Sequence, residues 1–286
     1  MGKITEALKK VTDERIKRVQ KRPEFRYVVK KVKNATIDQH VVAFHDPSSP
    51  IGEAFNILRT NIQSLHFTNN FKSFLITSSI DGEGKTITAL NTAITLAHDL
   101  NGKSVLLIDA DMRKGRIAKY LGIKSHKGLS EVLQEDGLEF ENVLLDPGIE
   151  NLTILLAGKV PKHASDLLNS RKTEKLLAQF KARFDYIIID TPPVMPLTDA
   201  CILGPMVDGV IFVVQAGRTQ RDMVAHAETR LSQARAKIVG FVLTNVEHYL
   251  PNYLNRYMKQ YDSYHYYNNR YYKDREKIQQ PAPINA

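Results

Sequence analysis

A glycine-rich segment that ends in lysine and threonine is the strongest chemical signal in the sequence. It reads Ser79-Ile80-Asp81-Gly82-Glu83-Gly84-Lys85-Thr86 and follows an apolar run directly before a helical segment. At such a strand-to-helix turn, backbone N–H groups and the helix dipole can hold phosphate oxygens. Serine replaces the first glycine of the G-x-x-x-x-G-K-[ST] pattern, a small change. The segment predicts a nucleotide-binding loop made of Asp81, Gly82, Glu83, Gly84, Lys85 and Thr86, with Lys85 on the phosphates and Thr86 on Mg²⁺.

Carboxylates stand at the ends of two other apolar runs. Asp109 and Asp111 follow Leu106-Leu107-Ile108, and Asp190 follows Ile187-Ile188-Ile189 and precedes Thr-Pro-Pro. Aspartate often ends a strand simply because it starts a turn, so each motif alone has a structural explanation. Neighbouring strands of a parallel sheet, however, open their carboxyl ends onto one crevice. The three motifs together therefore predict a single nucleotide site.

The elements that must position these residues are apolar strands separated by helical segments, from about residue 53 onward. The runs are apolar throughout rather than alternating, as is typical of strands covered on both faces. This pattern predicts an α/β fold with a P-loop NTPase-type parallel β-sheet flanked by helices on both faces. The expected strands are Ser73–Ser78, Ser104–Asp109, Leu152–Leu156, Tyr186–Asp190, Gly209–Gln215 and Ile238–Thr244.

The formal net charge of +9 is concentrated at the two ends of the chain. Residues 1–40 hold 12 basic and 5 acidic side chains, residues 249–286 hold 6 and 3, and residues 41–248 hold 22 and 23. We expect a basic N-terminal helix and linker over 1–50, a catalytic domain over 51–248 and a flexible tail over 249–286. The amphipathic helix fits a solvated extension and a docking element equally well.

The single cysteine, Cys201, excludes a disulfide framework and fits a reducing cytosol. No apolar run approaches the ~18–20 residues that cross a bilayer. The N-terminus also lacks the uninterrupted stretch of ~7–15 apolar residues that a signal peptide requires. These observations predict a cytoplasmic protein.

The three motifs resemble those of the bacterial tyrosine kinases of polysaccharide export and capsule loci, which look like ParA/MinD-type P-loop ATPases. The resemblance spans roughly residues 53–250 and includes AGKVPKHASDLLNS and PPVMPLTDACILGPMVDGVIFVVQAGRT. Its most specific element is Asp109-x-Asp111-x-Arg113 after three apolar residues, which ordinary P-loop ATPases lack. The resemblance implies an ATP-dependent protein-tyrosine autokinase that regulates exopolysaccharide or capsule biosynthesis and export.

The resemblance also implies roles for individual side chains. Magnesium would be bound by Thr86, by Asp109 or Asp111, and by Asp190. A tyrosine hydroxyl, with a pKa near ~10, is a poor nucleophile at neutral pH, and the resemblance suggests that Asp109 accepts its proton, with Asp111 as the alternative. Positioning and charge neutralisation by Lys85, Arg113 and the metal would supply most of the rate enhancement. Asn245 matches the adenine-contacting asparagine of the family, although a turn asparagine is a structural alternative.

Nine of the 12 tyrosines lie in the C-terminal tail. The first four recur every four residues and fit one face of a packed helix. The remaining five keep no helical period and are interleaved with polar residues, which favours a flexible substrate tail over packing. The resemblance implies autophosphorylation of such a cluster on a neighbouring subunit. The candidate acceptors are Tyr249, Tyr253, Tyr257, Tyr261, Tyr264, Tyr266, Tyr267, Tyr271 and Tyr272.

Assembly and partners follow from the resemblance alone. The family forms rings through Glu-x-x-Arg-x-x-Arg, which here reads Glu53, Asn56 and Arg59, so a homo-oligomer is expected but one charge of the contact is missing. A separate membrane-spanning activator (a polysaccharide co-polymerase) would hold the kinase peripherally at the inner face of the cell membrane. Protein tyrosine substrates and a cognate tyrosine phosphatase are the other expected partners, and no nucleic acid is expected.

Two other functions fit parts of the sequence. A ParA/MinD-like positioning ATPase would carry a signature lysine five residues before Lys85, where this chain has Ile80. A catalytically idle partner of an export complex would not need Lys85, Asp109, Asp111 and Asp190 intact.

Overall fold

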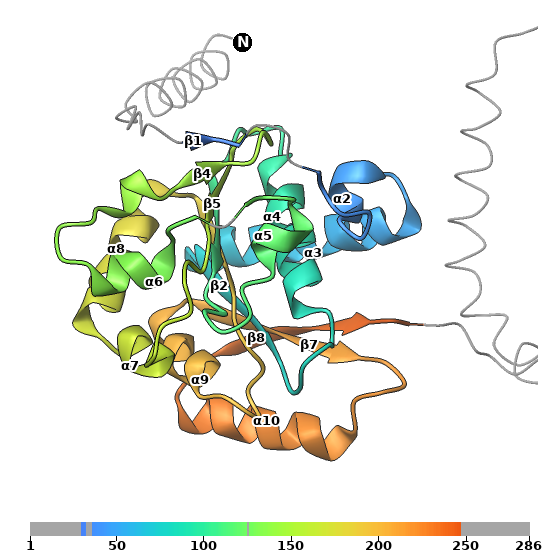
Figure 1. The fold of residues 1–286 in the computed structure, drawn as a ribbon. Helices are drawn as coiled ribbons and strands as arrows, with labels where there is room; N and C mark the ends of the chain where they lie inside the picture. The colour runs from blue at the N-terminus through green and yellow to red at the C-terminus, as the bar shows by residue number, and fades with distance from the viewer. Residues whose placement is uncertain (1–29, 33–35, 125, 247–286) are drawn as a thin grey trace, which may run out of the picture.

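The computed structural model describes residues 30–32, 36–124 and 126–246 and contains one central sheet (Figure 1). The strand order is β1-β4-β5-β3-β6-β2-β7-β8, and all neighbours run parallel except β4 and β5. The α/β fold predicted from the sequence is confirmed. The strands are β1 Lys30–Lys31, β2 Ser73–Ser78, β3 Val105–Asp109, β4 Leu145–Asp146, β5 Leu152–Leu155, β6 Tyr186–Asp190, β7 Gly209–Gln215 and β8 Ile238–Thr244.

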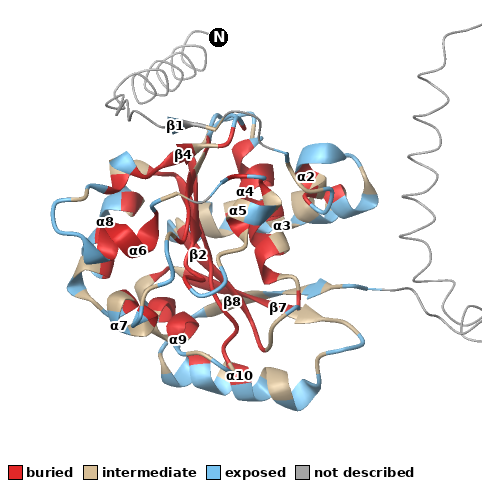
Figure 2. Cartoon of the chain, in the orientation of Figure 1, coloured by how far each residue is buried: buried red, intermediate tan, exposed pale blue. Residues whose placement is uncertain are grey.

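Helices cover both faces of the sheet, and Figure 2 shows buried residues along the strands and on the inner sides of the helices. One face carries α2 (Val42–His45), α3 (Pro50–Asn69), α4 (Lys85–Ala97) and α5 (Ile117–Tyr120). The other carries α6 (Leu129–Gln134), α7 (Ala164–Leu168), α8 (Arg171–Arg183), α9 (Asp199–Leu203) and α10 (Arg221–Gln233). Short 3₁₀ turns lie at Phe140–Asn142 and Gly204–Met206.

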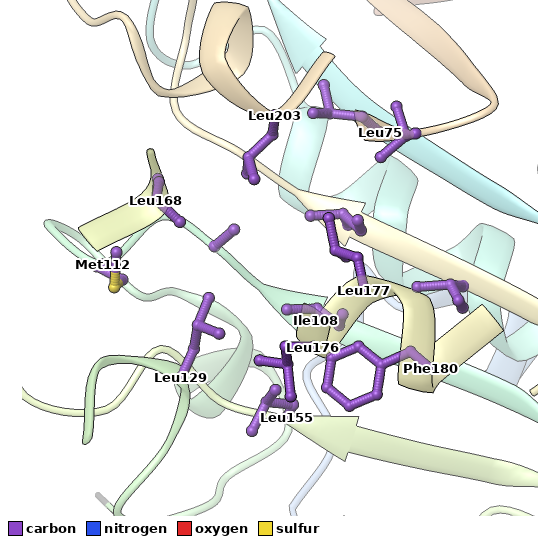
Figure 3. Packing of buried hydrophobic residues seen from close by; sticks show 14 of the residues in the cluster. Leu75, Ile108, Met112, Leu129, Leu155, Leu168, Leu176, Leu177, Phe180 and Leu203 are labelled. Atoms are coloured by element: carbon purple, nitrogen blue, oxygen red, sulfur yellow. The ribbon is translucent and has the colours of Figure 1, made fainter. Parts of the chain in front are cut away.

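Successive residues of the central strands enter two separate apolar cores. In β2, Phe74 and Ile76 belong to the α4 side, whereas Leu75 belongs to the α8 side. This division explains why the strands are apolar at every position. On the α8 side, Leu177 and Phe180 pack near Ile108, the residue before Asp109 (Figure 3). This packing of α8 on β3 fixes the position of the strand that ends in Asp109.

The segment expected as a linker is partly built into the folded body. Val41 is fully buried, and the side chain of Asn91 on α4 accepts a hydrogen bond from the Ala43 backbone N–H at 2.7 Å. The Asn91 amide also donates to the His40 carbonyl at 3.2 Å. This segment packs on α4 through Asn91, which lies about fifty residues later in the sequence, so local composition does not reveal the contact. The ordered body thus extends N-terminally of residue 50.

Several expectations concern other parts of the chain. The basic N-terminal helix and the tyrosine cluster between 249 and 272 lie outside the described residues. Within the described ranges, no helix is long and apolar enough to cross a membrane.

Candidate nucleotide and phosphoryl-transfer site

The glycine-rich loop connects the end of β2 to the first turn of α4, as expected for a phosphate-binding loop. Gly82 and Gly84 have positive φ angles of 85° and 94°, which glycine adopts without strain. A Cβ at Gly82 would lie 2.7 Å from Nη1 of Arg218, so the end of that arginine side chain would have to shift to admit it. The six predicted loop residues therefore form one turn whose last two residues begin α4.

Lys85 lies buried between two carboxylates. Its side chain is 4% exposed, and its Nζ lies 3.7 Å from Oδ1 of Asp81 and 3.9 Å from Oδ2 of Asp111. The structure thereby brings the lysine of the loop together with the acidic motif of the next strand. A cation held in this position can neutralise phosphate charge at the loop.

Glu83 faces into the protein rather than toward a ligand. Its carboxylate accepts hydrogen bonds from the Ile80 N–H at 2.6 Å and from the Thr219 hydroxyl, while its backbone carbonyl accepts one from the Thr244 hydroxyl at 2.7 Å. These contacts tie the loop to the segments after β7 and at the end of β8. Asn245 follows Thr244 directly and is exposed, so it lies at the same edge of the sheet as the loop.

Asp109 and Asp190 stand opposite each other on adjacent strands, and both are buried. The two oxygens of Asp109 accept backbone N–H groups of Asp111 at 3.2 Å and Ile117 at 3.1 Å. Burial, and then the charge of Asp190, raise the pKa of Asp109 well above its usual range. Burial likewise raises the pKa of Asp190 to about 7, although the charge of Lys85 opposes this shift.

The donor set fits a magnesium site that phosphates would complete. Both oxygens of Asp190 are buried and neither is satisfied by a well-formed hydrogen bond among the described residues, while the nearby Thr86 hydroxyl, in the first turn of α4, lowers the pKa of this carboxyl. Of the two alternatives in the acidic motif, Asp109 accepts a backbone N–H on each oxygen, whereas Asp111 accepts one from Lys114 on Oδ1 at 3.0 Å and has its Oδ2 near Lys85. In the described part of the chain, no three His, Cys, Asp or Glu side chains form a ready metal cage. Magnesium commonly uses only one or two protein carboxylates together with water and phosphates, so this arrangement suits it.

Arg113 points away from the loop toward the α7–α9 region. Its Nε lies 3.5 Å from Oδ2 of Asp199, which is fully buried, and its Nη2 donates to the Ser165 hydroxyl at 3.0 Å. Ser165 donates in turn to Asp199 at 2.7 Å. In this conformation the guanidinium anchors the acidic motif to two helices and does not contact the glycine-rich loop.

Three cations near the loop were missed by the sequence analysis. Lys114 Nζ lies 2.5 Å and Arg116 Nη2 3.4 Å from Oδ2 of Asp81, and Arg218 donates to the Asp81 carbonyl at 3.2 Å. Lys114 and Arg116 follow the acidic motif within three residues, and this proximity in sequence could have indicated that they lie near the nucleotide loop. Arg218 comes from the segment after β7, and only the strand order brings it to the loop.

The residues of the expected ring motif make contacts within the chain. Asn56 donates from its side-chain amide to the Glu53 carboxylate at 3.0 Å, and Arg59 donates to the Thr95 carbonyl at 3.4 Å. All three side chains are partly buried along α3.

Known proteins resemble this chain in both sequence and structure. A family model described as an AAA domain matches residues 72–224. Tyrosine-protein kinase YwqD of Bacillus subtilis is 33% identical over 215 residues, covering 75% of this chain and 90% of the relative. Tyrosine-protein kinase CpsD of Streptococcus agalactiae is 35% identical over 202 residues, covering 70% and 86%. The kinase domain of Escherichia coli tyrosine kinase ETK superposes with a TM-score of 0.71 at 27% identity, covering 82% of this chain and 86% of that domain. On these grounds the chain belongs to the bacterial tyrosine-protein kinases, a family of P-loop NTPase fold, as its motifs predicted.

Proposed function

We propose that this tyrosine kinase transfers the γ-phosphoryl group of Mg-ATP to tyrosines 249–272 of a neighbouring copy of the same chain. The observation that carries the proposal is the convergence of the glycine-rich loop, Lys85 and two buried aspartates at one edge of the sheet. The described chain leaves β8 at this same edge, where Thr244 contacts the loop. The tyrosine cluster begins at Tyr249, a few residues further on.

Each side chain has a distinct task in the proposed transfer. The loop N–H groups and Lys85 hold the phosphate chain, and Asn245 contacts the adenine. Asp190 and Thr86 would hold Mg²⁺, which supplies charge neutralisation across the phosphate oxygens when it is bound. Asp109 accepts the proton of the tyrosine hydroxyl. Burial raises the pKa of Asp109, so the positive charge of bound Mg²⁺ would be needed to keep this carboxylate in the ionised form that can accept a proton.

Asp111 is the alternative base. It lies beside Lys85 and shares the acidic motif with Asp109. A variant with asparagine at the true base should retain Mg-ATP binding and lose phosphoryl transfer. Comparison of Asp109→Asn with Asp111→Asn therefore separates the two assignments.

The proposed biological setting is exopolysaccharide or capsule biosynthesis and export. We place the kinase at the inner face of the membrane through a separate membrane-spanning activator, as a homo-oligomer that involves Glu53 and Arg59. Protein tyrosine substrates and a tyrosine phosphatase complete the expected cycle. The names of the relatives support the kinase activity, whereas these partners are inferred from the family resemblance.

The proposal is tested by mapping phosphosites with mass spectrometry after incubation with Mg-ATP, with and without the activator. We expect phosphotyrosine within 249–272. Lys85→Met should abolish it, because the phosphates lose their principal cation, whereas Lys127→Met, which changes an exposed lysine paired with Glu135, should not. ATP hydrolysis without phosphotyrosine, even with the activator, would favour a positioning ATPase instead.

Transfer between copies is tested by mixing two variants, neither of which can phosphorylate its own tail. One chain carries Lys85→Met with its tyrosines intact, and the other has a normal site with all nine tail tyrosines changed to phenylalanine. Labelling of the Lys85→Met chain is the expected result. Absence of labelling in the mixture, when the wild-type chain labels itself, would show that transfer occurs only within one chain.

A further inference from the structure

The glycine-rich loop carries its own anion, and three cations gather on it. Asp81 is the third residue after β2 and directly precedes Gly82, and its Oδ2 contacts Lys114 and Arg116. Its Oδ1 lies 3.7 Å from Lys85. The hydrogen bond from Lys114 is the main reason that the pKa of Asp81 lies below its usual value. One carboxylate thus engages cations that come from both the loop and the segment after β3.

These cations differ from Arg113 in the burial of their anionic partner. The Arg113 side chain is itself 36% exposed, but its partner Asp199 is fully buried. The Lys114 and Arg116 side chains are 53% and 40% exposed, and Asp81 is 38% exposed. Ion pairs that are this accessible to water are weak and readily exchanged for another anion. Lys114 and Arg116 are therefore available to a ligand at the loop.

The position of the cluster indicates what that ligand is. Asp81 belongs to the turn that wraps the phosphates, and Arg218 fixes the turn from the other side through the Asp81 carbonyl. Position 80 of the loop is isoleucine, so Lys85 is the one lysine within residues 79–86. Guanidinium and ammonium groups that already surround one carboxylate oxygen can surround a phosphate oxygen with the same geometry.

We propose that Lys114 and Arg116 bind the phosphate chain of the nucleotide, and that the Asp81 carboxylate occupies their phosphate-binding positions until the nucleotide displaces it. The inference rests on the proposed nucleotide site at the loop. It adds two phosphate-binding residues and assigns Asp81 as a competing anion. Nucleotide affinity is then set by the exchange of one anion for another.

The proposal predicts opposite effects for the carboxylate and for its partners. Asp81→Asn should tighten binding of Mg-ADP about three- to tenfold, the range expected when two exposed competing ion pairs are removed. Lys114→Ala and Arg116→Ala should weaken binding. The weakening should be larger in the Asp81→Asn background, because there the cations no longer lose an internal partner when the phosphates bind.

Isothermal titration calorimetry with Mg-ADP, and separately with adenosine, tests this on the full chain. Adenosine lacks phosphates, so its affinity should be unchanged by all of these substitutions. Glu135→Gln is the matched control, because it removes a carboxylate of similar exposure, 45% against 38% for Asp81, from an ion pair with Lys127 that does not involve the loop. Thermal unfolding of each variant confirms that it is folded, and Asp81→Ser provides a second neutral side chain.

The outcomes separate this inference from the proposed function. If wild-type protein binds Mg-ADP but Asp81→Asn and Asp81→Ser bind it equally or more weakly, the competing role of Asp81 is wrong. If Lys114→Ala and Arg116→Ala leave affinity unchanged in both backgrounds, their phosphate-binding role is wrong. If wild-type and Lys85→Met proteins both fail to bind Mg-ADP, the nucleotide site itself is wrong, and this inference is overturned with it.

Discussion

Glu83 offers a quantitative test of how the glycine-rich loop is held. The residue is 1% exposed, and its carboxylate accepts two hydrogen bonds, from the Ile80 N–H at 2.6 Å and from the Thr219 hydroxyl. Glu83→Ala removes the acceptor of both. The Ile80 N–H would lose its partner inside the turn, and the segment after β7 would lose its side-chain link to the loop.

The expected cost follows from the number and type of these bonds. A hydrogen bond to a charged group contributes about 1.5–3 kcal/mol, and removal of one partner also leaves a buried polar group unsatisfied. Two such bonds give a loss of about 3–6 kcal/mol for Glu83→Ala. Glu83→Gln should cost less than about 2 kcal/mol, because its amide oxygen can accept from Ile80 and its NH₂ group can donate to Thr219.

Equilibrium unfolding in urea measures these differences, and a double-mutant cycle isolates one bond. We expect Thr219→Val to be more destabilising in the wild type than in the Glu83→Ala background, where only the bond that its hydroxyl accepts from the Gln215 N–H is left to lose. Mg-ADP affinity should fall in Glu83→Ala, because the turn that carries the phosphate-binding N–H groups is no longer held. Glu135→Gln, which changes an exposed carboxylate, serves as the control.

Two results would refute this reasoning. Equal destabilisation by Glu83→Ala and Glu83→Gln would mean that negative charge, rather than hydrogen-bond acceptance, is what the site requires. Additive effects of Glu83→Ala and Thr219→Val would mean that the two side chains do not interact energetically.

Two further predictions concern the elements behind the site. Asp208 is partly buried, which by itself would raise its pKa. Hydrogen bonds from the Lys181 ammonium and from the backbone N–H groups of Lys72 and Ser73 nevertheless hold the pKa below its usual value. The ionised carboxylate therefore contributes fully to the free energy of unfolding above about pH 4, and this contribution is lost as the pH falls further. Asp208→Asn should lower the free energy of unfolding by about 2–4 kcal/mol at pH 7 and by progressively less in acid. Urea unfolding at several pH values measures this difference. Gly128→Ala should lower stability by about 1–3 kcal/mol or more in thermal unfolding, because its Cβ would lie 2.1 Å from the Leu156 carbonyl oxygen; Gly240→Ala, with open space, should show no comparable loss. A flat pH profile of the Asp208→Asn difference, or equal melting of the two glycine variants, would contradict these assignments.

The chemical motifs and the central strands could be predicted because their signals are local. A strand buried on both faces is apolar at every position, which made β2, β6 and β7 recognisable with their full bounds. β8 is equally apolar in sequence and was recognised with its full bounds, although it is an edge strand on which Phe241 and Leu243 are exposed. The phosphate-binding loop is likewise encoded in consecutive residues. The shorter β1 and β4 contain two residues each, too few to produce a periodic pattern.

The way in which the motifs meet depends on contacts that no local pattern contains. Strand order and register place Asp109 opposite Asp190, and the packing of α7 and α9 gives Arg113 a buried partner at Asp199. Arg218 reaches the loop only because β7 lies next to β2.

The sequence by itself therefore determined the fold class, the family and which residues carry the chemistry, since these depend on residue type and short-range spacing. The tertiary structure decided which side chains face the nucleotide loop and which face the protein interior. That choice is made by packing and charge between residues up to about 160 positions apart, as between Thr244 and Glu83.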